Sequence, residues 1–332
     1  MEGTNHLVLF ARRGRIRRRG EFLVVGEDKY PITRVSGIVL SGGAQITTQA
    51  VKLALDYGIP ITFASGSRIL GVVVPFHDRF VELRRRQWEV VLTQRSLRVG
   101  LARSIVISSI RARKAVLEFL ESVGVVTSVG RAVERMERLE DRAEGADRVG
   151  ALRGYEGRAA RIYFRALSEA LPGWAFSGGR TRRPPRDPFN AAISFGYTAV
   201  LFPVMLARIV AAGLDPFAGF LHEIRGRKPA LALDLMDEWR ALAVDVPVLR
   251  LFLEGGLSRS DFRRDGEAVL LRDAEAVAIP VLSVLSRVRG GLLEAIDRRL
   301  TEFRNAVRKL SEPEPLEIKS DDVGGVWEVV QV

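Results

Sequence analysis

The chain has 332 residues, of which 47% are hydrophobic and 27% are charged, a composition that excludes a disordered protein and allows two folded domains. Its net charge of +11 favours an anionic partner, with nucleic acid the commonest and an anionic membrane surface the lesser alternative. Because cysteine is absent, disulfides, thiolate zinc sites and a cysteine nucleophile are excluded.

Arginine dominates the basic residues, since only six of the 51 are lysine. Arginine binds phosphate through two hydrogen bonds at once and always stays charged, which suits a nucleic-acid partner. Genomic base composition or growth at high temperature explains the same excess equally well.

Residues 1–78 are predicted to form a β-rich, sandwich-like domain. Apolar runs of strand length occupy residues 6–10, 37–40, 60–63 and 71–74. Residues 14–25 suggest an arginine-rich hairpin, and Thr47 is a good cap for a short helix that ends near Gly58. A single short helix among several strands is typical of a small sandwich-like domain.

Strand-like alternation gives way to helical periodicity from Phe80 onward, and residues 79–90 are predicted to be a linker that runs into the first helix. Long amphipathic segments then predict an all-α domain over residues 91–310. The helices are expected within residues 101–120, 133–139, 151–171, 188–212, 231–242 and 279–310. Residues 311–332 contain two prolines and six acidic residues and predict a flexible acidic tail. The predicted fold class is therefore α+β multidomain.

One stretch has to be weighed as a membrane span, because residues 189–207 carry no charged side chain. Polar residues and a proline interrupt this stretch, and Asp187 followed by Pro188 is a good helix start. We therefore predict a helix through the centre of a soluble domain. The first residues do not resemble a signal peptide, so we expect a cytoplasmic protein without membrane association.

The sequence lacks the signatures of a phosphate-binding loop, a nucleophile elbow and a dinucleotide-binding turn. Candidate ligands occur instead in three segments of the helical region. In the first, Glu156 and Tyr163 share one helical face with small alanines between them. The alternative is a solvated glutamate at a helix start, where the helix dipole favours it.

The second segment, residues 180–190, is a basic loop before a helix N-terminus. Its four arginines would hold phosphates well. The alternative is a charged loop that is merely exposed.

The third segment places His222 twelve and fifteen residues before Asp234 and Asp237. The two aspartates are three residues apart, so both carboxylates point the same way on a helix. Hard oxygen ligands with one imidazole suit Mg²⁺ or Mn²⁺. The alternative for His222 is a core histidine with satisfied hydrogen bonds. His6 and His77 have no comparable pair of acidic residues near them in the sequence, so we predict that both are structural.

The ordered succession of these segments resembles the CRISPR-associated Cas-one family of endonuclease-integrases. The resemblance is carried by Arg186-Asp187-Pro188-Phe189-Asn190-Ala191, Ser194-Phe195-Gly196-Tyr197, Gly213-Leu214-Asp215-Pro216, Gly219-Phe220-Leu221-His222 and Leu233-Asp234-Leu235-Met236-Asp237-Glu238-Trp239-Arg240. The segment from Glu156 to Phe164 resembles the catalytic-glutamate helix of that family. Two positions depart from the family pattern: Asp237 is often glutamate there, and Ala241 replaces a frequent proline. The acidic tail has no counterpart.

The resemblance implies a homodimer formed largely through the N-terminal domains, a small Cas-two partner subunit, and DNA as the substrate. It also implies a metal ion, Mg²⁺ or Mn²⁺, held by the expected catalytic residues Glu156, His222 and Asp237.

Further residues are expected around this site. Asp234, Tyr163 and Asn190 are expected to support it. The residues expected to bind the DNA backbone are Arg180, Arg182, Arg183, Arg186, Arg225, Arg227 and Lys228.

The expected reaction is metal-assisted phosphoryl transfer on DNA. With a DNA 3′-hydroxyl as nucleophile, a captured fragment is inserted into a repeat array as a new spacer, in antiviral defence. With water as nucleophile, branched or linear DNA is cleaved. His222 could instead act as a general acid or base. Two alternatives stay open, a structure-specific DNA repair nuclease and a non-catalytic DNA-binding scaffold.

Overall fold

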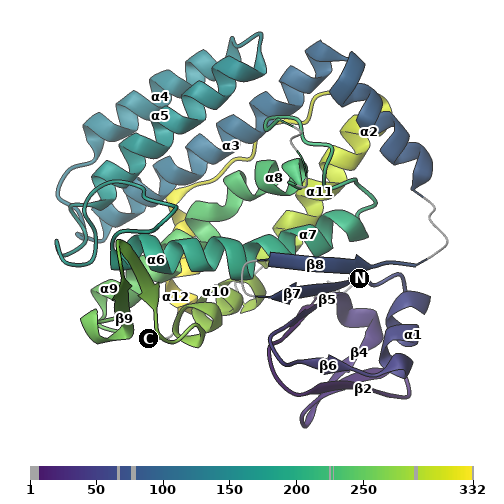
Figure 1. Ribbon diagram of the computed structural model, residues 1–332. Coiled ribbons are helices and arrows are strands. Elements are labelled where there is room, and N and C mark those ends of the chain that lie inside the picture. The colour runs from purple at the N-terminus through teal and green to yellow at the C-terminus, as the bar shows by residue number, and fades with distance from the viewer. Residues whose placement is uncertain are drawn as a thin grey trace.

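In the computed structural model, the chain forms a β-rich N-terminal part and a larger helical part (Figure 1). The structure describes residues 7–65, 68–75, 80–223, 226, 228–287 and 291–330. His6 and His77, predicted to be structural, lie outside these residues, as do the predicted DNA contacts Arg225 and Arg227.

Two four-stranded sheets form the N-terminal part. The first has the order β1-β5-β7-β8, with strands Leu7–Ala11, Val35–Ser41, Ile61–Ser65 and Arg68–Val73. The second has the order β4-β3-β2-β6, with strands Asp28–Pro31, Phe22–Val25, Arg15–Arg19 and Gln45–Ile46. A short 3₁₀ turn, η1 (Ile32–Arg34), leads from β4 into β5.

Both sheets contribute to one apolar core, which confirms the predicted sandwich-like arrangement. Ile16 and Leu23 of the second sheet and Ile38 of the first belong to the same buried cluster. The one helix of this part, α1 (Thr48–Asp56), adds Leu53. Its predicted cap is confirmed, because the Thr47 side chain accepts a hydrogen bond from the backbone of Ala50.

The helical part is organised around a long central helix, α3 (Arg95–Ser122). Its apolar side chains are buried along nearly its whole length because other helices pack on several sides of it. These neighbours are α2 (Val81–Thr93), α4 (Gly130–Glu144), α5 (Val149–Leu167) and α8 (Ala230–Arg240). The remaining helices are α6 (Pro188–Phe195), α7 (Phe202–Ala211), α9 (Val246–Leu253), α10 (Glu275–Arg287), α11 (Leu292–Lys309) and α12 (Ser320–Val329).

The structure differs from the predicted linker over residues 79–90. Helix α2 already begins at Val81 and packs into the helical part. Its Gln87 donates to the carbonyls of Asp215 and Ala218, and its Trp88 ring nitrogen donates to the Asp215 carboxylate at 2.8 Å. The sequence did not show these partners, because they lie more than 120 residues away along the chain.

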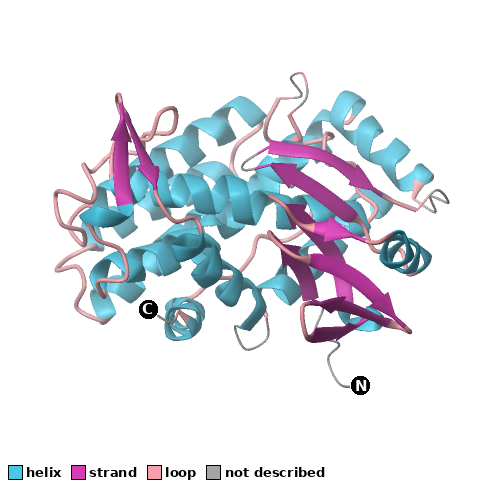
Figure 2. Ribbon diagram, turned by 60° about the horizontal axis from the view of Figure 1, so that its bottom comes forward, coloured by secondary structure: helices cyan, strands magenta, loops and turns pink. Residues whose placement is uncertain are grey.

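The helical part is not purely helical. After the short turn η4 (Arg259–Asp261), an antiparallel hairpin pairs β9 (Phe262–Asp265) with β10 (Ala268–Leu271). Figure 2 shows this hairpin at one end of the helical part, far from the N-terminal sheets. Its Val269 donates to the carbonyl of Pro185, so the hairpin holds the predicted basic loop in place.

The predicted flexible tail is packed on the helical part up to Val330. Helix α12 buries Val323 and Val326, and the Trp327 ring lies 5.6 Å from that of Phe119. Before α12, the backbone of Leu316 donates to the Ser108 hydroxyl at 2.8 Å. A few apolar side chains are enough to anchor the tail. The sequence did not reveal them because the composition of the tail as a whole is polar and acidic.

We expect deletion of residues 311–332 to lower the thermal stability of the chain. Full burial of one valine side chain contributes about 1.5–3 kcal/mol, and the tail buries three, Val323, Val326 and Val330. Thermal unfolding followed by circular dichroism measures the loss, and Val326→Asp in the full chain serves as a second variant. An unchanged midpoint in both variants would show that the tail does not stabilise the fold.

The apolar stretch Pro188–Ala211 is a core segment of the molecule. It is long and apolar enough to cross a membrane, but 72% of its most apolar window is buried inside the protein. The predicted start is confirmed, since the Asp187 side chain accepts from the backbone of Asn190 and Pro188 is the first helical residue. Helix α7 of this stretch packs on strands β5 and β7 and so joins the two parts.

Two π-helical segments interrupt the helices near the centre of the molecule. They are η2 (Gly196–Leu201), between α6 and α7, and η3 (Ala241–Asp245), between α8 and α9. They touch each other closely, because a β-carbon on Gly196 would lie only 2.5 Å from Cγ1 of Val244. Such turns are frequent at functional sites.

Candidate active site

Glu156 lies in the middle of α5, so it is not a solvated glutamate at a helix start. Its carboxylate accepts a hydrogen bond from Arg113 of α3 at 2.9 Å. Arg113 is buried and also donates to the Ser109 hydroxyl at 2.6 Å. Burial opposes the charge of Arg113, but the carboxylates of Glu156 and Asp237 more than compensate, and its pKa is raised.

Asp237 is buried on α8, and its negative charge helps to raise the pKa of Arg113. Its carboxylate is paired with Arg240, one helical turn further on. The backbone carbonyl of Asp237 accepts from the Ser109 hydroxyl at 2.8 Å, which fixes α8 against α3. Ser109 also accepts from Arg113, so Glu156 and Asp237, far apart in the sequence, are linked through the same segment of α3.

Asp234 shapes the loop that carries His222. One of its carboxylate oxygens accepts from the backbone of Phe220 at 2.6 Å and of Leu221 at 2.8 Å. The other accepts from the backbone of His222 at 2.9 Å and lies 2.7 Å from Nδ1 of the same residue. Gly219 is needed here, because a β-carbon on it would lie 2.6 Å from that of Ala230. Asp234 is thus fully engaged within the loop, as befits its predicted supporting role.

The contact with Asp234 orients the His222 ring. When Nδ1 donates to the carboxylate, Nε2 keeps its lone pair and is the ring nitrogen left for a ligand. The hydrogen bond to Asp234 raises the pKa of His222, against an opposing effect of burial, and the charge of Asp237 adds to the rise.

We therefore expect the His222 imidazole to titrate above its ordinary pKa in metal-free protein, and Asp234→Asn to lower that value. Because the folded-state pKa is raised, the stabilising contribution of this pair is complete below the unfolded-state pKa and is lost as the pH rises through the folded-state value. NMR titration of the ring protons measures both proteins. The same pKa in wild type and Asp234→Asn would contradict the assigned contact.

A buried polar network adjoins the site through the two π-helical segments. Tyr197 of η2 donates to the carboxylate of Asp245 in η3. Burial raises the pKa of Asp245 to about 6. Burial, reinforced by the charge of Asp245, also raises the pKa of Tyr163 on α5, one of the predicted supporting residues. Arg240 lies 5.2 Å above the Tyr197 ring, so the partner of Asp237 rests on this network.

The predicted basic loop divides into an inner and an outer part. Arg180 points inward, donating to Asn190 at 2.7 Å and to Ser194 at 2.9 Å, and burial lowers its pKa. Asn190 is fully buried and also donates to the carbonyl of Gly179 at 2.8 Å, so its supporting role is to fold this loop.

The outer part of the loop is exposed. Arg182 and Arg183 are exposed, and Arg186 is exposed but paired with Glu267 of the hairpin at 3.1 Å. Lys228, the described member of the second predicted basic group, is exposed next to α8.

A basic cleft of about 440 Å³ is lined in part by Glu223, the residue that follows His222 in the chain. Its arginines are Arg95, Arg98, Arg148 and Arg153. Arg153 pairs with Glu223 at 3.1 Å, and Arg98 donates to the carbonyl of Phe220 at 3.0 Å, so the cleft reaches the loop of the candidate site. None of these four arginines was predicted from the sequence to bind DNA.

Comparison with known proteins decides the family. The family model described as CRISPR associated protein Cas1, here the Cas-one family, matches residues 7–279. The chain belongs to the Cas1 family. It is 59% identical over 332 residues to the CRISPR-associated endonuclease Cas1 of Methanopyrus kandleri, covering 100% of both chains. To the CRISPR-associated endonuclease Cas1 1 of Thermus thermophilus it is 38% identical over 251 residues, covering 73% of this chain and 74% of that one.

A solved structure shares the fold of this Cas1 chain. In a partial Cas6-RT-Cas1–Cas2 complex, one chain superposes with a TM-score of 0.74 at 25% identity, covering 94% of this chain and 98% of that chain. The family predicted from the sequence is confirmed, and with it the class of enzyme, an endonuclease.

The donor chemistry of this Cas1 site fits a hard divalent cation, since it offers one imidazole nitrogen and the carboxylates of Glu156 and Asp237. Within the part of the chain that the structure describes, however, no three His, Asp or Glu side chains are already gathered closely enough to hold an ion. Each carboxylate is bound to an arginine instead. A cation would have to take the place of these guanidinium groups.

Three residues of this Cas1 site were not assigned a role from the sequence: Arg113, Arg240 and Asp245. Only Asp245 had a detectable signal. It is the single acid between Ala241 and Val248, whereas Arg113 lies between Arg111 and Lys114 and does not stand out. A charged residue in such a run is expected to have a specific buried partner.

Proposed function

We propose that this Cas1 protein is a metal-dependent DNA endonuclease and integrase that inserts captured DNA fragments as new spacers into a CRISPR repeat array. The observation that carries the proposal is that Glu156 and Asp237 are both held at the Ser109–Arg113 segment of α3, with the His222 ring oriented by Asp234. The identity to curated Cas1 endonucleases supports the same reaction class.

In this proposal Glu156, His222 and Asp237 hold Mg²⁺ or Mn²⁺. Bound there, the cation would neutralise charge on the scissile phosphate and stabilise the leaving oxygen. Asp234 keeps the His222 proton on Nδ1, so that Nε2 stays available as a ligand. Arg113 and Arg240, released from the carboxylates, are placed to bind oxygens of the DNA phosphate.

The DNA strand is proposed to reach this site through the basic cleft that Glu223 helps to line. Arg95 and Arg148 of the cleft are placed to contact phosphates without reading bases. Arg182 and Arg183 of the basic loop, together with Lys228, are exposed, and we propose that they also contact DNA. Arg180 instead binds Asn190 and organises the loop from within.

The proposed assembly is a homodimer with a small Cas2 subunit. It is supported by the similar chain found in a complex that is named for both Cas1 and Cas2. The packing of α7 on the first sheet gives the N-terminal part a fixed position for such a dimer.

The decisive experiment is joining of a short duplex to supercoiled DNA that carries a repeat, with Mg²⁺, with Mn²⁺ and with chelator. Joined product is expected only with metal, and duplexes with 3′-deoxy ends should not be joined, because the nucleophile is missing. Cleavage of branched DNA without any joining would identify a repair nuclease instead. DNA binding without nicking or joining under any condition would identify a scaffold.

A further inference from the structure

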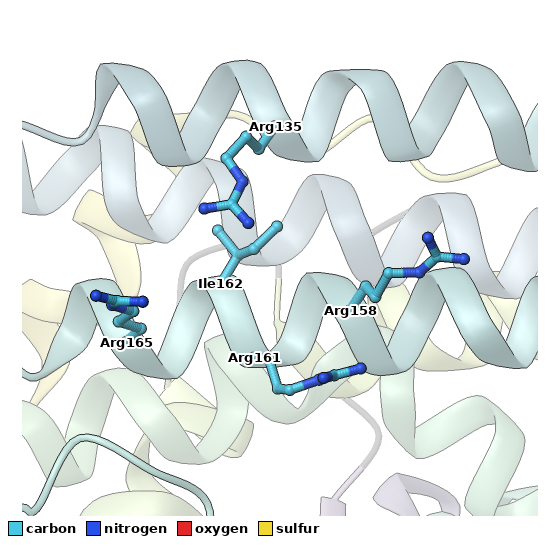
Figure 3. Close-up of a pocket in the computed structure, with 5 residues that line it drawn as sticks. All are labelled: Arg135, Arg158, Arg161, Ile162 and Arg165. Carbon is cyan, nitrogen blue, oxygen red and sulfur yellow. The ribbon is translucent and has the colours of Figure 1, made fainter.

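A second basic cleft lies between α4 and α5, on the outer side of the helical part. It has a volume of about 250 Å³. Four arginines line it, Arg135 from α4 and Arg158, Arg161 and Arg165 from α5, with Ile162 between them (Figure 3). All four arginines are exposed.

Among the described residues, none of these four arginines forms an ion pair with a carboxylate. Two of them contact only neutral groups, since Arg158 donates to the carbonyl of Gly154 and Arg161 donates to that of Gly157. Elsewhere on α4, by contrast, Arg138 is paired with Glu134 at 2.7 Å. Four like charges around one hollow repel one another, so an anion in the cleft would be bound favourably.

The spacing of these arginines suits a nucleic-acid backbone. Arg158 and Arg165 are separated by about 10 Å along the helix axis, with Arg161 between them. Successive phosphates of one DNA strand advance by about 3.4 Å along the duplex axis, so the row spans about three of them. Guanidinium groups bind phosphate oxygens through two hydrogen bonds, which is why arginine suits such a surface better than lysine.

The cleft is separate from the candidate active site although both use α5. On a regular helix the three arginines lie roughly 140–180° around the axis from Glu156. Glu156 points towards Arg113 on α3, whereas Arg158 and Arg165 lie on the side of α5 that faces α4 and Arg161 lies on the side away from it. A strand held in the active site therefore does not fill this cleft.

We propose that the cleft between α4 and α5 is a second DNA-binding site, which holds backbone phosphates of a DNA segment outside the active site. This inference rests on the proposed function, since it takes DNA as the anionic partner. Contacts to backbone phosphates carry no sequence information, so the site would bind any sequence and anchor the length of DNA that extends from the reacting end.

The test compares two double variants of the full chain in duplex DNA binding, measured by fluorescence anisotropy in chelator over a range of salt. In Arg161→Gln/Arg165→Gln two cleft arginines are neutralised. In the control, Arg85→Gln/Arg138→Gln, two exposed arginines that are ion-paired to glutamates are neutralised instead. Glutamine is a good helix former, and thermal unfolding confirms that both variants fold.

We expect the cleft variant to bind on the order of tenfold more weakly. Its salt slope should fall by about two, because each neutralised arginine no longer binds its phosphate. The control should stay close to wild type. Equal weakening in both variants would show a general effect of charge and overturn the proposal, as would unchanged binding in the cleft variant. A loss of binding to anionic lipid vesicles alone would assign the cleft to a membrane and also overturn it.

A second measurement tests direct contact. Because the chain contains no cysteine, Ile162→Cys carries a photo-crosslinker at one position only. Crosslinking to DNA from residue 162, and none from Tyr57→Cys on the exposed surface of the N-terminal part, is the expected result. No crosslink from residue 162 would overturn the proposal. Wild type that binds DNA but joins none would refute the proposed function, while the binding comparison could still be made.

Discussion

Replacing Asp237 by asparagine is expected to lower metal-dependent joining and cleavage of DNA by about a thousandfold. Loss of one charged ligand removes several kcal/mol of transition-state stabilisation, and each 1.36 kcal/mol is about a factor of ten. Asparagine has the same shape, so the buried position should not collapse. Joining of a labelled duplex with Mn²⁺ gives the rate.

Glu156→Gln and His222→Ala are expected to behave in the same way. Asp141→Asn, an exposed carboxylate on α4, is the charge control and should keep full activity. DNA binding in chelator should stay near wild type in every variant, because the basic clefts remain. Wild-type rates with Mn²⁺ in Asp237→Asn would remove this residue from the site.

The second large effect is on stability. Arg299→Met is expected to lower the free energy of unfolding by about 3–5 kcal/mol, the cost of leaving a buried charge without its partner. Arg299 of α11 is 1% exposed and donates to Glu238 of α8 at 2.7 Å, where Glu238 is fully buried. It also donates to the carbonyl of Glu314, so it ties the tail to the core. Denaturant unfolding measures the change.

Two comparisons make this result specific. Arg298→Met places the same substitution on the neighbouring exposed residue of α11 and should change stability little. The double variant Glu238→Leu/Arg299→Met should recover a substantial part of the loss, since a hydrophobic replacement of a whole ion pair is often neutral. A single Arg299→Met that matches Arg298→Met would contradict the assigned role.

Local chemistry was sufficient to predict several elements from the sequence. Asp187, followed by Pro188, and Thr47 each cap a helix. Each cap accepts a hydrogen bond from a backbone amide three residues further on, so the local sequence is enough to predict where the helix starts. The hairpin over residues 262–271 was missed because its arginine-rich first strand lacks an apolar alternation. Helix α12 was missed because its two buried valines sit among acidic residues and glycines.

The sequence singled out the candidate ligands but not the side chains that surround them. The ranking of Asp237 as a ligand and Asp234 as its support stays a prediction, and the structure adds that the loop amides use both oxygens of Asp234. The roles of Glu156, His222 and Asp237 as ligands stay predictions. Arg113 was missed because its three neighbours in the site come from α5, α8 and η3, and no spacing within α3 reveals them.

The two π-helical segments have a consequence for how this chain tolerates length changes. Each residue added to or removed from a helix rotates everything beyond it by about 100°. Removing one residue from Ala241–Asp245 could convert η3 into ordinary helix with its backbone bonds intact, yet the Asp245 carboxylate would swing away from Tyr197. Helical content would barely change while the hydrogen bond between Tyr197 and Asp245 was lost. A single-residue deletion, invisible to circular dichroism, would thus disconnect the two π-helical segments within the buried network.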